Sequence, residues 1–413
     1  MANGFRYPEA RVAGPIRSRA TSIGRARSVA RFFEVEAAGG ILLLAATAAA
    51  LLWANSPVAD SYEELSEEVR PWVNDGLMVL FFFVVGLEIK REVVSGQLST
   101  ARAAALPVVA AVGGMVVPAA IYLLLNPTAP TRDGWGIPMA TDIAFAVGVL
   151  TLLGPRVPPA LKVLLLALAV VDDIGAIVVI AVAYTDDLSA GWLGLAGLGL
   201  AAAAVLRRAG VWFLPLFVVI GLFVWLATLE SGIHPTIAGV ALGVLVPERA
   251  RSIRRRRTVP VAERLEDALH PWVSYGVVPL FALANAGIPL SAESIADAAA
   301  STVTAGVVAG LVVGKVAGIL GASAVAIRLG IGRLPAGIGW RHLAGLSALA
   351  GIGFTVSIFV TGLAFEGQSL QDEAKVGVLV ASVVAASIGA AILLAGQPAS
   401  DAAVSTRKSA SSE

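Results

Sequence analysis

The chain has 413 residues, of which 57% are hydrophobic and only 14% are charged, and its mean hydropathy is +0.82. This is more apolar surface than one globular core can bury, so the composition predicts a protein that crosses a membrane many times. The absence of cysteine excludes thiol catalysis, thiolate metal sites and disulfides.

The two ends of the chain are polar. Residues 1–31 carry seven arginines and one acid, Glu9. We interpret residues 1–33 as a disordered basic tail in the cytoplasm and not as a nucleic-acid-binding arm, and residues 397–413 as a disordered C-terminal tail. A cleavable signal peptide is not expected, because the first apolar run lacks a small-residue cleavage site. Residues 34–396 then form the membrane domain.

Twelve apolar segments in this domain approach the length of about 20 residues that a membrane helix needs. Several of them are short or interrupted. Their cores are residues 37–54, 76–96, 104–125, 137–153, 160–184, 191–206, 211–229, 232–246, 271–289, 303–327, 337–364 and 374–395.

The charges of the connecting loops support this count. If the basic N-terminus is cytoplasmic, the even-numbered loops should be basic, and they contain Lys90, Arg91, Arg102, Arg156, Lys162, Arg207, Arg208, Arg249, Arg251, Arg254 to Arg257, Arg328, Arg333 and Arg341. The opposite loops hold Asp60, Glu63, Glu64, Glu67, Glu68, Asp186, Asp187, Glu293 and Asp297. The pattern predicts twelve spans with both termini in the cytoplasm. The membrane would be the plasma (inner) membrane of a bacterium.

Asp172 and Asp173 interrupt the fifth span near its middle, in the sequence LAVVDDIGAI. An ionised carboxylate in a lipid-spanning helix costs at least a few kcal/mol, so such a pair indicates an ion or proton site. Adjacent helical residues point about 100° apart, so the two side chains face different parts of a shared cavity. We expect one carboxylate to bind a cation and both to exchange protons; the alternative is a pair at a helix end that faces water.

A second intramembrane acid, Asp142, follows Thr141 in the short fourth span. Short or glycine-interrupted spans in matching places predict broken helices, whose ends expose partial charges inside the membrane. Gly351 and Gly353 in the eleventh span mark the matching place. Residues 104–184 and 303–395 could therefore be inverted repeats, although glycine-rich spans also occur where helices simply pack closely.

Lys315 is the only lysine well inside a span. A buried ammonium group needs a carboxylate partner or must lose its proton, so we pair Lys315 with Asp172 or Asp173. The alternative is that the side chain reaches an interface. A lysine that binds a carboxylate in one state and releases it in another would couple protonation to cation binding.

Two mixed-charge segments lie at the cytoplasmic ends of the second and ninth spans. The first contains Glu88, Arg91 and Glu92, which share one helix face, and the second contains Glu266 and His270. Together they could gate access by pH, because coupled carboxylates and histidine titrate in the physiological range. The alternative for each residue is an ordinary solvated helix end.

Five motifs give the chain a resemblance to a known family. At ATDIAFA, LAVVDDIGAI, VGLEIKRE, LEDALHPW and GIGFTVSIF the sequence resembles the NhaA family of sodium/proton antiporters, over roughly residues 34–396. The resemblance implies an all-α integral membrane protein with twelve transmembrane helices in an inverted-repeat fold. Spans four and eleven would be broken and would cross at mid-membrane.

The resemblance also implies roles for single residues. Asp173 would be the main Na+ ligand, beside Thr141, and Asp172 would exchange protons as the partner of Lys315. Asp142 would compensate the positive helix ends. The response of the transporter to cytoplasmic pH would involve Glu88, Arg91, Glu92, Glu266 and His270. The chain departs from close relatives at Glu263 and Asp267, where they carry Lys and His, so its pH profile should differ.

The sequence thus predicts a secondary transporter and not an enzyme. It would exchange cytoplasmic Na+ or Li+ for external H+ by alternating access, would move net charge and would need no cofactor. Its partners would be these ions and the lipid bilayer, with a homodimer left open. The alternatives are a sodium-coupled symporter of an organic solute, an intramembrane aspartyl protease that uses Asp142 and Asp173, and a passive channel.

Overall fold

The computed structural model describes residues 16–185, 188–251 and 258–395. This part of the chain is helical apart from one short antiparallel hairpin, β1 (Arg249–Arg251) with β2 (Thr258–Pro260). The α-helices are α1 (Ile16–Ala54), α2 (Ala59–Pro71), α3 (Met78–Ser95), α4 (Ala101–Leu125), α5 (Ile143–Leu152), α6 (Pro159–Ala183), α7 (Ala190–Arg208), α8 (Leu214–Leu229), α9 (Thr236–Leu245), α10 (Val261–Trp272), α11 (Val278–Asn285), α12 (Ala292–Ala300), α13 (Thr302–Val308), α14 (Lys315–Arg328), α15 (Trp340–Leu349), α16 (Phe354–Ala364) and α17 (Gln368–Leu394).

Short turns of other helical types extend or join these helices. Three are π-helical, η1 (Trp72–Leu77), η5 (Val273–Val277) and η6 (Ala309–Gly314). Three are 3₁₀ turns, η2 (Gln97–Ser99), η3 (Thr131–Met139) and η4 (Gly154–Arg156). Each π-helical segment continues directly into an α-helix, so α13, η6 and α14 form one continuous helix from Thr302 to Arg328.

Six helical segments of the described chain are long and apolar enough to cross a membrane, and two bent helix pairs raise the number to eight. The six are Val35–Ala54, Ala101–Leu125, Pro159–Ala183, Ala190–Arg208, Thr302–Arg328 and Gln368–Leu394. The bent pairs are η3 with α5, at 43°, and α15 with α16, at 46°. They coincide with the fourth and eleventh predicted spans, so both predicted interruptions are present.

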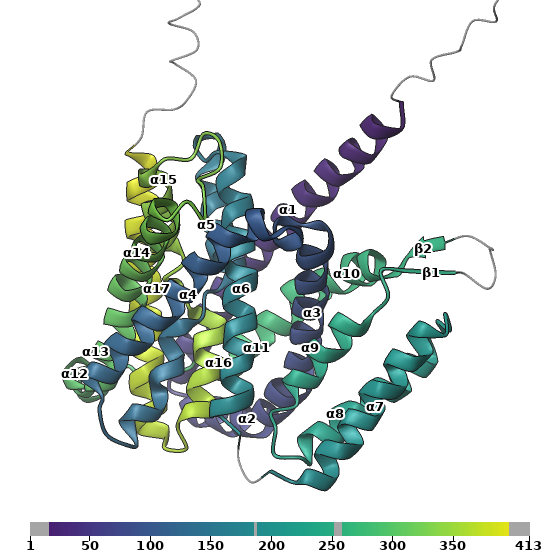
Figure 1. Ribbon diagram of the computed structural model, residues 1–413. Helices are drawn as coiled ribbons and strands as arrows, with labels where there is room; N and C mark the ends of the chain where they lie inside the picture. The colour runs from purple at the N-terminus through teal and green to yellow at the C-terminus, as the bar shows by residue number, and fades with distance from the viewer. Residues whose placement is uncertain (1–15, 186–187, 252–257, 396–413) are drawn as a thin grey trace, which may run out of the picture.

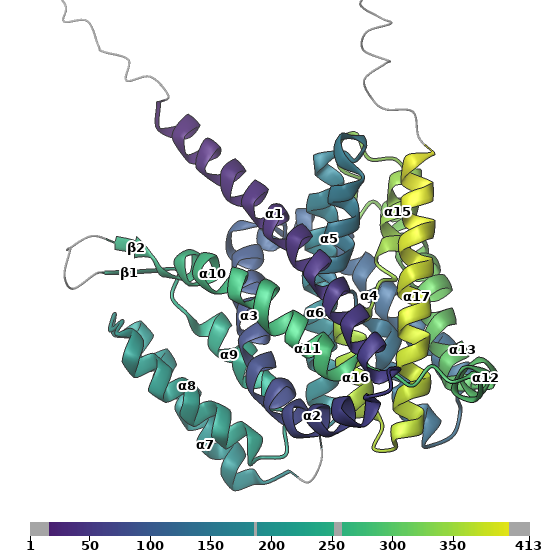
Figure 2. The ribbon, with the colours of Figure 1, turned by 180° about the vertical axis from the view of Figure 1, so that it is seen from behind.

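The N-terminal part of the chain differs from the expectation. Helix α1 begins at Ile16 and extends well beyond the bundle (Figures 1 and 2), so residues 16–33 are helical where the sequence predicted a disordered tail. The helix runs without a break into the first apolar segment, which gives it a continuous backbone hydrogen-bonding pattern. Residues 1–15 and the predicted C-terminal tail, 397–413, lie outside the described residues.

Glycines allow α4 and the α13–η6–α14 helix to pack backbone to backbone. A Cβ on Gly113 would clash with the backbone of Gly318, and a Cβ on Gly314 would lie 2.8 Å from the Cα of Pro118. Small residues at such crossings permit close helix approach in a membrane, where apolar side chains alone give little preference for association. The glycines of these two helices therefore have a packing role, the alternative that the sequence left open.

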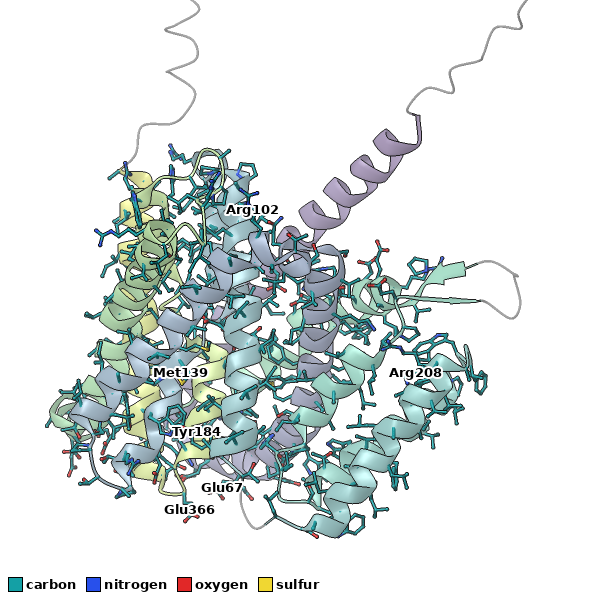
Figure 3. The ribbon with its side chains drawn as sticks, viewed as in Figure 1. Glu67, Arg102, Met139, Tyr184, Arg208 and Glu366 are labelled. Carbon is teal, nitrogen blue, oxygen red and sulfur yellow. The ribbon has the colours of Figure 1, made fainter. Side chains whose placement is uncertain are left out.

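The interior of the bundle lies between two differently charged ends. In Figure 3, Met139, at the end of η3, lies inside the bundle between Arg102 at one end and Glu67 and Glu366 at the other. The start of α1 and the end of α17 lie at the Arg102 end (Figures 1 and 3). The polar residues of the broken helices are thus placed far from both ends.

Candidate ion-binding site

The two bent helix pairs contact each other at their breaks. The backbone N–H of Asp142 donates to the carbonyl of Ile352 over 2.6 Å, and the Thr141 hydroxyl lies 2.8 Å from the carbonyl oxygen of Ala350. Glycine is required in the second break, because a Cβ on Gly351 would clash with the carbonyl oxygen of Leu311. Each break therefore supplies hydrogen-bond partners for backbone groups of the other.

Asp142 is the N-cap of α5 and also contacts the first turn of α16. Its Oδ1 accepts a hydrogen bond from the N–H of Phe145 over 2.9 Å. Its Oδ2 accepts from the N–H of Thr355 at 3.0 Å and from the Thr355 hydroxyl at 2.7 Å. The N-terminus of a helix carries a partial positive charge and unpaired N–H groups, so one carboxylate here stabilises two helix ends.

Lys315 is the first residue of α14, and its side chain reaches the C-terminal end of η3. Its Nζ is 2.7 Å from Asp172 Oδ2 and donates to the carbonyl of Met139 over 2.5 Å. Both side chains of the ion pair are fully buried. The ammonium group thus balances a carboxylate and the partial negative charge of a helix C-terminus. Of the two pairings that the sequence left open, the structure has Lys315 with Asp172.

Thr141 connects this ion pair to the second break. Its hydroxyl lies 2.7 Å from Asp172 Oδ2 and 2.8 Å from the Ala350 carbonyl. A hydroxyl has one proton to donate, so it serves one of these acceptors at a time. The other oxygen of Asp172, Oδ1, is buried and has no hydrogen-bond partner among the described residues.

Asp173 has different surroundings from Asp172, although the two are adjacent. Asp173 lines a cavity of about 50 Å³ together with Thr141, Asp142 and Thr355, whereas Asp172 points into the packed contact with Lys315. In the part of the chain that the structure describes, no residue donates a hydrogen bond to Asp173. A cavity of this size holds a few water molecules or a partly hydrated ion.

The cavity extends from Asp173 to the predicted pH-responsive residues. Glu88 and His270 line it, and Glu266 of α10 forms an ion pair with Arg91 of α3. Burial raises the pKa of Glu266, and the Arg91 guanidinium opposes this shift only in part. Four of the five residues named from sequence are therefore brought together.

Glu92, the fifth residue, is turned away from this group. Its Oε1 accepts a hydrogen bond from the N–H of Gln97 over 2.5 Å. The Glu92 carboxylate therefore provides an acceptor for a backbone N–H group just after the C-terminus of α3, whose C-cap is Gly96. The shared helix face predicted for Glu88 and Glu92 does not bring Glu92 to the cavity.

Glu36 of α1 was missed by the sequence analysis. Its Oε1 is 2.6 Å from Nε2 of His270 and accepts a hydrogen bond from the Ser274 hydroxyl over 3.2 Å. Glu36 also lines the cavity. The available signal was an acid directly before the first apolar run, in a segment otherwise dominated by arginine.

His270 lies in α10, just before the ninth predicted span. Burial lowers the pKa of His270, but the close contact with the Glu36 carboxylate and the other neighbouring carboxylates outweigh burial and raise the pKa above the usual 6.5. A raised pKa keeps the imidazole protonated to higher pH. The charge of His270 therefore changes at a higher pH than that of a free imidazole.

The oxygen atoms around the cavity suit a hard cation. Carboxylate and hydroxyl oxygens are among the ligands that such ions prefer, and Asp173 and Thr141 bring both kinds to the cavity. The ion pair of Asp172 with Lys315 adjoins the two helix breaks. A carboxylate that faces a cavity and a buried ion pair therefore lie next to each other.

Comparison with known proteins agrees with this geometry. Residues 30–393 match the family model described as Na+/H+ antiporter 1. The chain is 45% identical to the Na(+)/H(+) antiporter NhaA 2 of Sorangium cellulosum, over 88% of each chain. It is 48% identical to the Na(+)/H(+) antiporter NhaA of Mesorhizobium japonicum and 50% identical to the Na(+)/H(+) antiporter NhaA 2 of Pseudomonas syringae, over 88% of this chain and 93% and 94% of the relatives. The chain therefore belongs to the NhaA family of Na+/H+ antiporters.

Proposed function

We propose that this protein exchanges cytoplasmic Na+ or Li+ for external protons by alternating access, with Asp173 as the main cation ligand. The proposal rests above all on the contrast between two adjacent carboxylates. Asp173 faces the cavity, whereas Asp172 is paired with Lys315. Asp173 would be accessible to an incoming cation. Asp172 is paired with the ammonium group of Lys315, which the bound cation could displace.

Competition between the cation and protons gives the exchange. A cation beside Asp173 repels a proton from the same carboxylate, and cation release allows the proton to return. Attraction of Asp172 to the bound cation would weaken its ion pair with Lys315. The orphan Oδ1 of Asp172 offers a further oxygen for the cation or a proton in that state.

Membrane potential would drive the cycle. Two titrating centres, Asp173 and the Asp172–Lys315 pair, can exchange more than one proton for one monovalent cation, so each cycle would move net charge. Moving one charge across 100 mV corresponds to about 2.3 kcal/mol. This is sufficient to extrude Na+ against a gradient of more than tenfold, since about 1.4 kcal/mol equals a factor of ten.

Aromatic side chains would block access to the cavity from the other side of the membrane. Phe359 packs against Phe82 and Phe281, with ring centroids 5.6 Å and 6.1 Å away. A second hollow, of about 340 Å³, lies beyond Phe359 and is lined by Asp75 and His234. The conformation described here would be open to the cytoplasm. In the conformation that is open to the outside, these rings would have to move apart.

The twelve-span topology belongs to the same proposal. The two bent pairs correspond to each other within residues 104–184 and 303–395, which supports two inverted repeats with the cation site at their crossing. Both termini would lie in the cytoplasm of a bacterial cell, with the protein in its inner membrane. The basic loops and the common end of α1 and α17 support this orientation.

Cavity volume favours exchange over symport of an organic solute. Sites for drug-sized molecules usually measure roughly 300 Å³ or more, whereas the cavity at Asp173 measures about 50 Å³. The hydrogen bonds of Asp142 disfavour an aspartyl protease. Both of its oxygens already accept bonds from helix ends, so Asp142 is not available to share a catalytic water with Asp173.

The test uses proton movement in everted membrane vesicles, with Na+, Li+ and K+ added in turn. We expect Na+ and Li+ to release protons and Asp173→Asn to abolish the response. Glu64→Gln, which removes an exposed carboxylate on α2, is the matched control and should respond as the unchanged protein does. Undiminished Na+-dependent proton movement in Asp173→Asn would refute the site assignment.

A further inference from the structure

The first half of the broken fourth span, η3, is a long 3₁₀ segment that needs support from other helices. Runs of this helix type longer than three or four residues are uncommon, because their hydrogen bonds have poor geometry. The segment has 9 residues and contains Pro138, which lacks a backbone donor. It leads directly to Thr141 and Asp142, and its last carbonyl, that of Met139, accepts from Lys315. The position of η3 therefore sets the position of several groups at the ion site.

Tyr184 supports η3 from α6, the helix that carries the aspartate pair. Its hydroxyl donates to the carbonyl of Asp133 over 2.8 Å and accepts from the N–H of Gly136 over 3.0 Å. Its ring stacks on Trp135, with ring centroids 6.4 Å apart and an angle of 26° between the planes. Tyr184 is the C-cap of α6, about three turns after Asp173. One side chain thus joins two successive turns of η3 to the end of α6.

Two glycines of η3 allow tyrosine hydroxyls to reach its backbone. A Cβ on Gly136 would lie 2.6 Å from the Tyr184 hydroxyl oxygen, and a Cβ on Gly134 would clash with the hydroxyl of Tyr122. Tyr122 comes from α4 and donates to the carbonyl of Thr131 over 2.8 Å. The two tyrosines make the same kind of contact, but only Tyr184 belongs to a helix that carries a proposed ion ligand.

The contacts at the inner end of η3 are not sufficient to keep this end at a constant distance from α6. The Thr141 hydroxyl has one proton for two acceptors, Asp172 and the Ala350 carbonyl, and the Asp172 carboxylate would change partners when a cation binds. Both partners of Tyr184 are backbone groups, which keep the same protonation throughout a transport cycle. Tyr184 also lies nearer the Glu67 and Glu366 end of the bundle than Met139 does (Figure 3). Its contact can therefore persist while the contacts at the ion site change.

We propose that Tyr184 is a positioning residue that keeps η3 and α6 together as one rigid body, so that Thr141 and Asp173 retain the spacing that distinguishes one monovalent cation from another. The inference rests on the proposed exchange function and adds a residue that determines ion selectivity. Thr141 and Asp173 line the same cavity. Selectivity between ions of different radius depends on the size and the rigidity of the set of ligands, and Tyr184 supplies rigidity without touching the ion.

The test compares the apparent KM values for Na+ and Li+ in everted vesicles. Tyr184→Phe removes the hydroxyl and keeps the ring, and we expect it to change the ratio of the two KM values by about fivefold, the size expected for one lost hydrogen bond of ordinary strength. If Tyr184→Phe does not accumulate in the membrane, Gly136→Ala provides the same measurement, because its Cβ displaces the hydroxyl from η3. An unchanged KM ratio in a variant that still exchanges ions overturns the proposal.

Two other tyrosines provide matched controls. Tyr122→Phe removes the corresponding hydroxyl on the α4 side of η3, so it should lower the melting midpoint and leave the KM ratio unchanged. Tyr275→Phe, at a position that is 41% exposed, should change neither quantity. Equal changes of the KM ratio in Tyr122→Phe and Tyr184→Phe would show that both tyrosines only stabilise η3, and would also overturn the proposal.

A chemical cross-link tests whether η3 and α6 stay together during transport. The chain has no cysteine, so Gly136→Cys/Tyr184→Cys introduces its only two thiols, and removal of the Tyr184 ring leaves room for the side chain at position 136. Bridging the thiols with a short bismaleimide should preserve Na+-dependent proton movement and return the KM ratio towards that of the unchanged protein. Exchange that is lost on bridging, but kept in each single variant treated with the same reagent, would show that the two segments must separate.

Failure of this inference is distinguishable from failure of the exchange function. If the unchanged protein shows no Na+-dependent proton movement, the exchange proposal itself is wrong. If exchange persists and depends on Asp173 while the KM ratio of Tyr184→Phe equals that of the unchanged protein, only the role of Tyr184 is wrong.

Discussion

Replacing Lys315 by methionine tests the central ion pair through stability. The two side chains of the pair are fully buried, and Lys315→Met keeps much of the side-chain volume while removing the charge. The change leaves the Asp172 carboxylate without its cation and the Met139 carbonyl without a donor. Breaking a buried pair in this way typically costs about 3–5 kcal/mol, because an uncompensated charge remains.

The magnitude should depend on the partner and on pH. Asp172→Asn/Lys315→Met removes both charges, so it should recover a large part of the loss, since replacing both members of a buried pair is often close to neutral. Acidic pH should also reduce the loss in Lys315→Met, because protonation neutralises the orphaned carboxylate. The coupling energy of the double-mutant cycle then reports the interaction itself.

Thermal unfolding of the detergent-solubilised protein, followed by intrinsic fluorescence, provides the measurement. We expect the midpoint of Lys315→Met to fall by several degrees at alkaline pH and the double variant to lie between it and the unchanged protein. The cycle also needs the single variant Asp172→Asn. If the losses in melting midpoint of the two single variants simply add up in the double variant at every pH, Lys315 and Asp172 do not interact and this account of the site is refuted.

Three further predictions concern other parts of the structure. Phe359→Ala should open the aromatic barrier and produce a proton leak in vesicles without added Na+; vesicles as tight as those of the unchanged protein would argue against a barrier there. Gly318→Leu should separate α4 from α14 and reduce the amount of folded protein recovered in detergent, whereas Gly321→Leu, where a side chain meets open space, should be tolerated. His270→Ala should destabilise the protein most at acidic pH: its raised pKa means that its contribution is fully present below the unfolded pKa of about 6.5 and is lost as pH rises through the folded value, so a difference in melting midpoint that grows with pH would contradict this sign.

Several features of the site could be read from the sequence because each is a local energetic anomaly. Asp172, Asp173, Asp142 and Lys315 are charges in apolar segments, and such charges need partners or water wherever the helices pack. The interruptions at residues 140–142 and 350–353 were also predictable. Glycine, proline and short apolar runs weaken a helix through their own backbone properties, independently of the rest of the chain.

Other features depended on contacts between distant segments. The start of α1 at Ile16 was not predicted, because a polar, arginine-rich composition does not by itself exclude a helix that continues from a stable span. The orientation of Glu92 towards Gln97, away from the cavity, follows from where α3 ends. A helical spacing places side chains on one face but does not determine which neighbour each one meets.

The sequence alone determined that two adjacent carboxylates lie in one apolar segment, and it predicted that Lys315 pairs with one of them. It could not separate Asp172 from Asp173 by their surroundings, because both have the same chemistry and the same apolar flanks. Only the tertiary structure decided that Asp172 contacts Lys315 and Asp173 faces the cavity, and that Glu36 joins His270. The physical reason is that the environment of a buried charge is set by the helices packed around it, which the chain brings together from positions far apart in sequence.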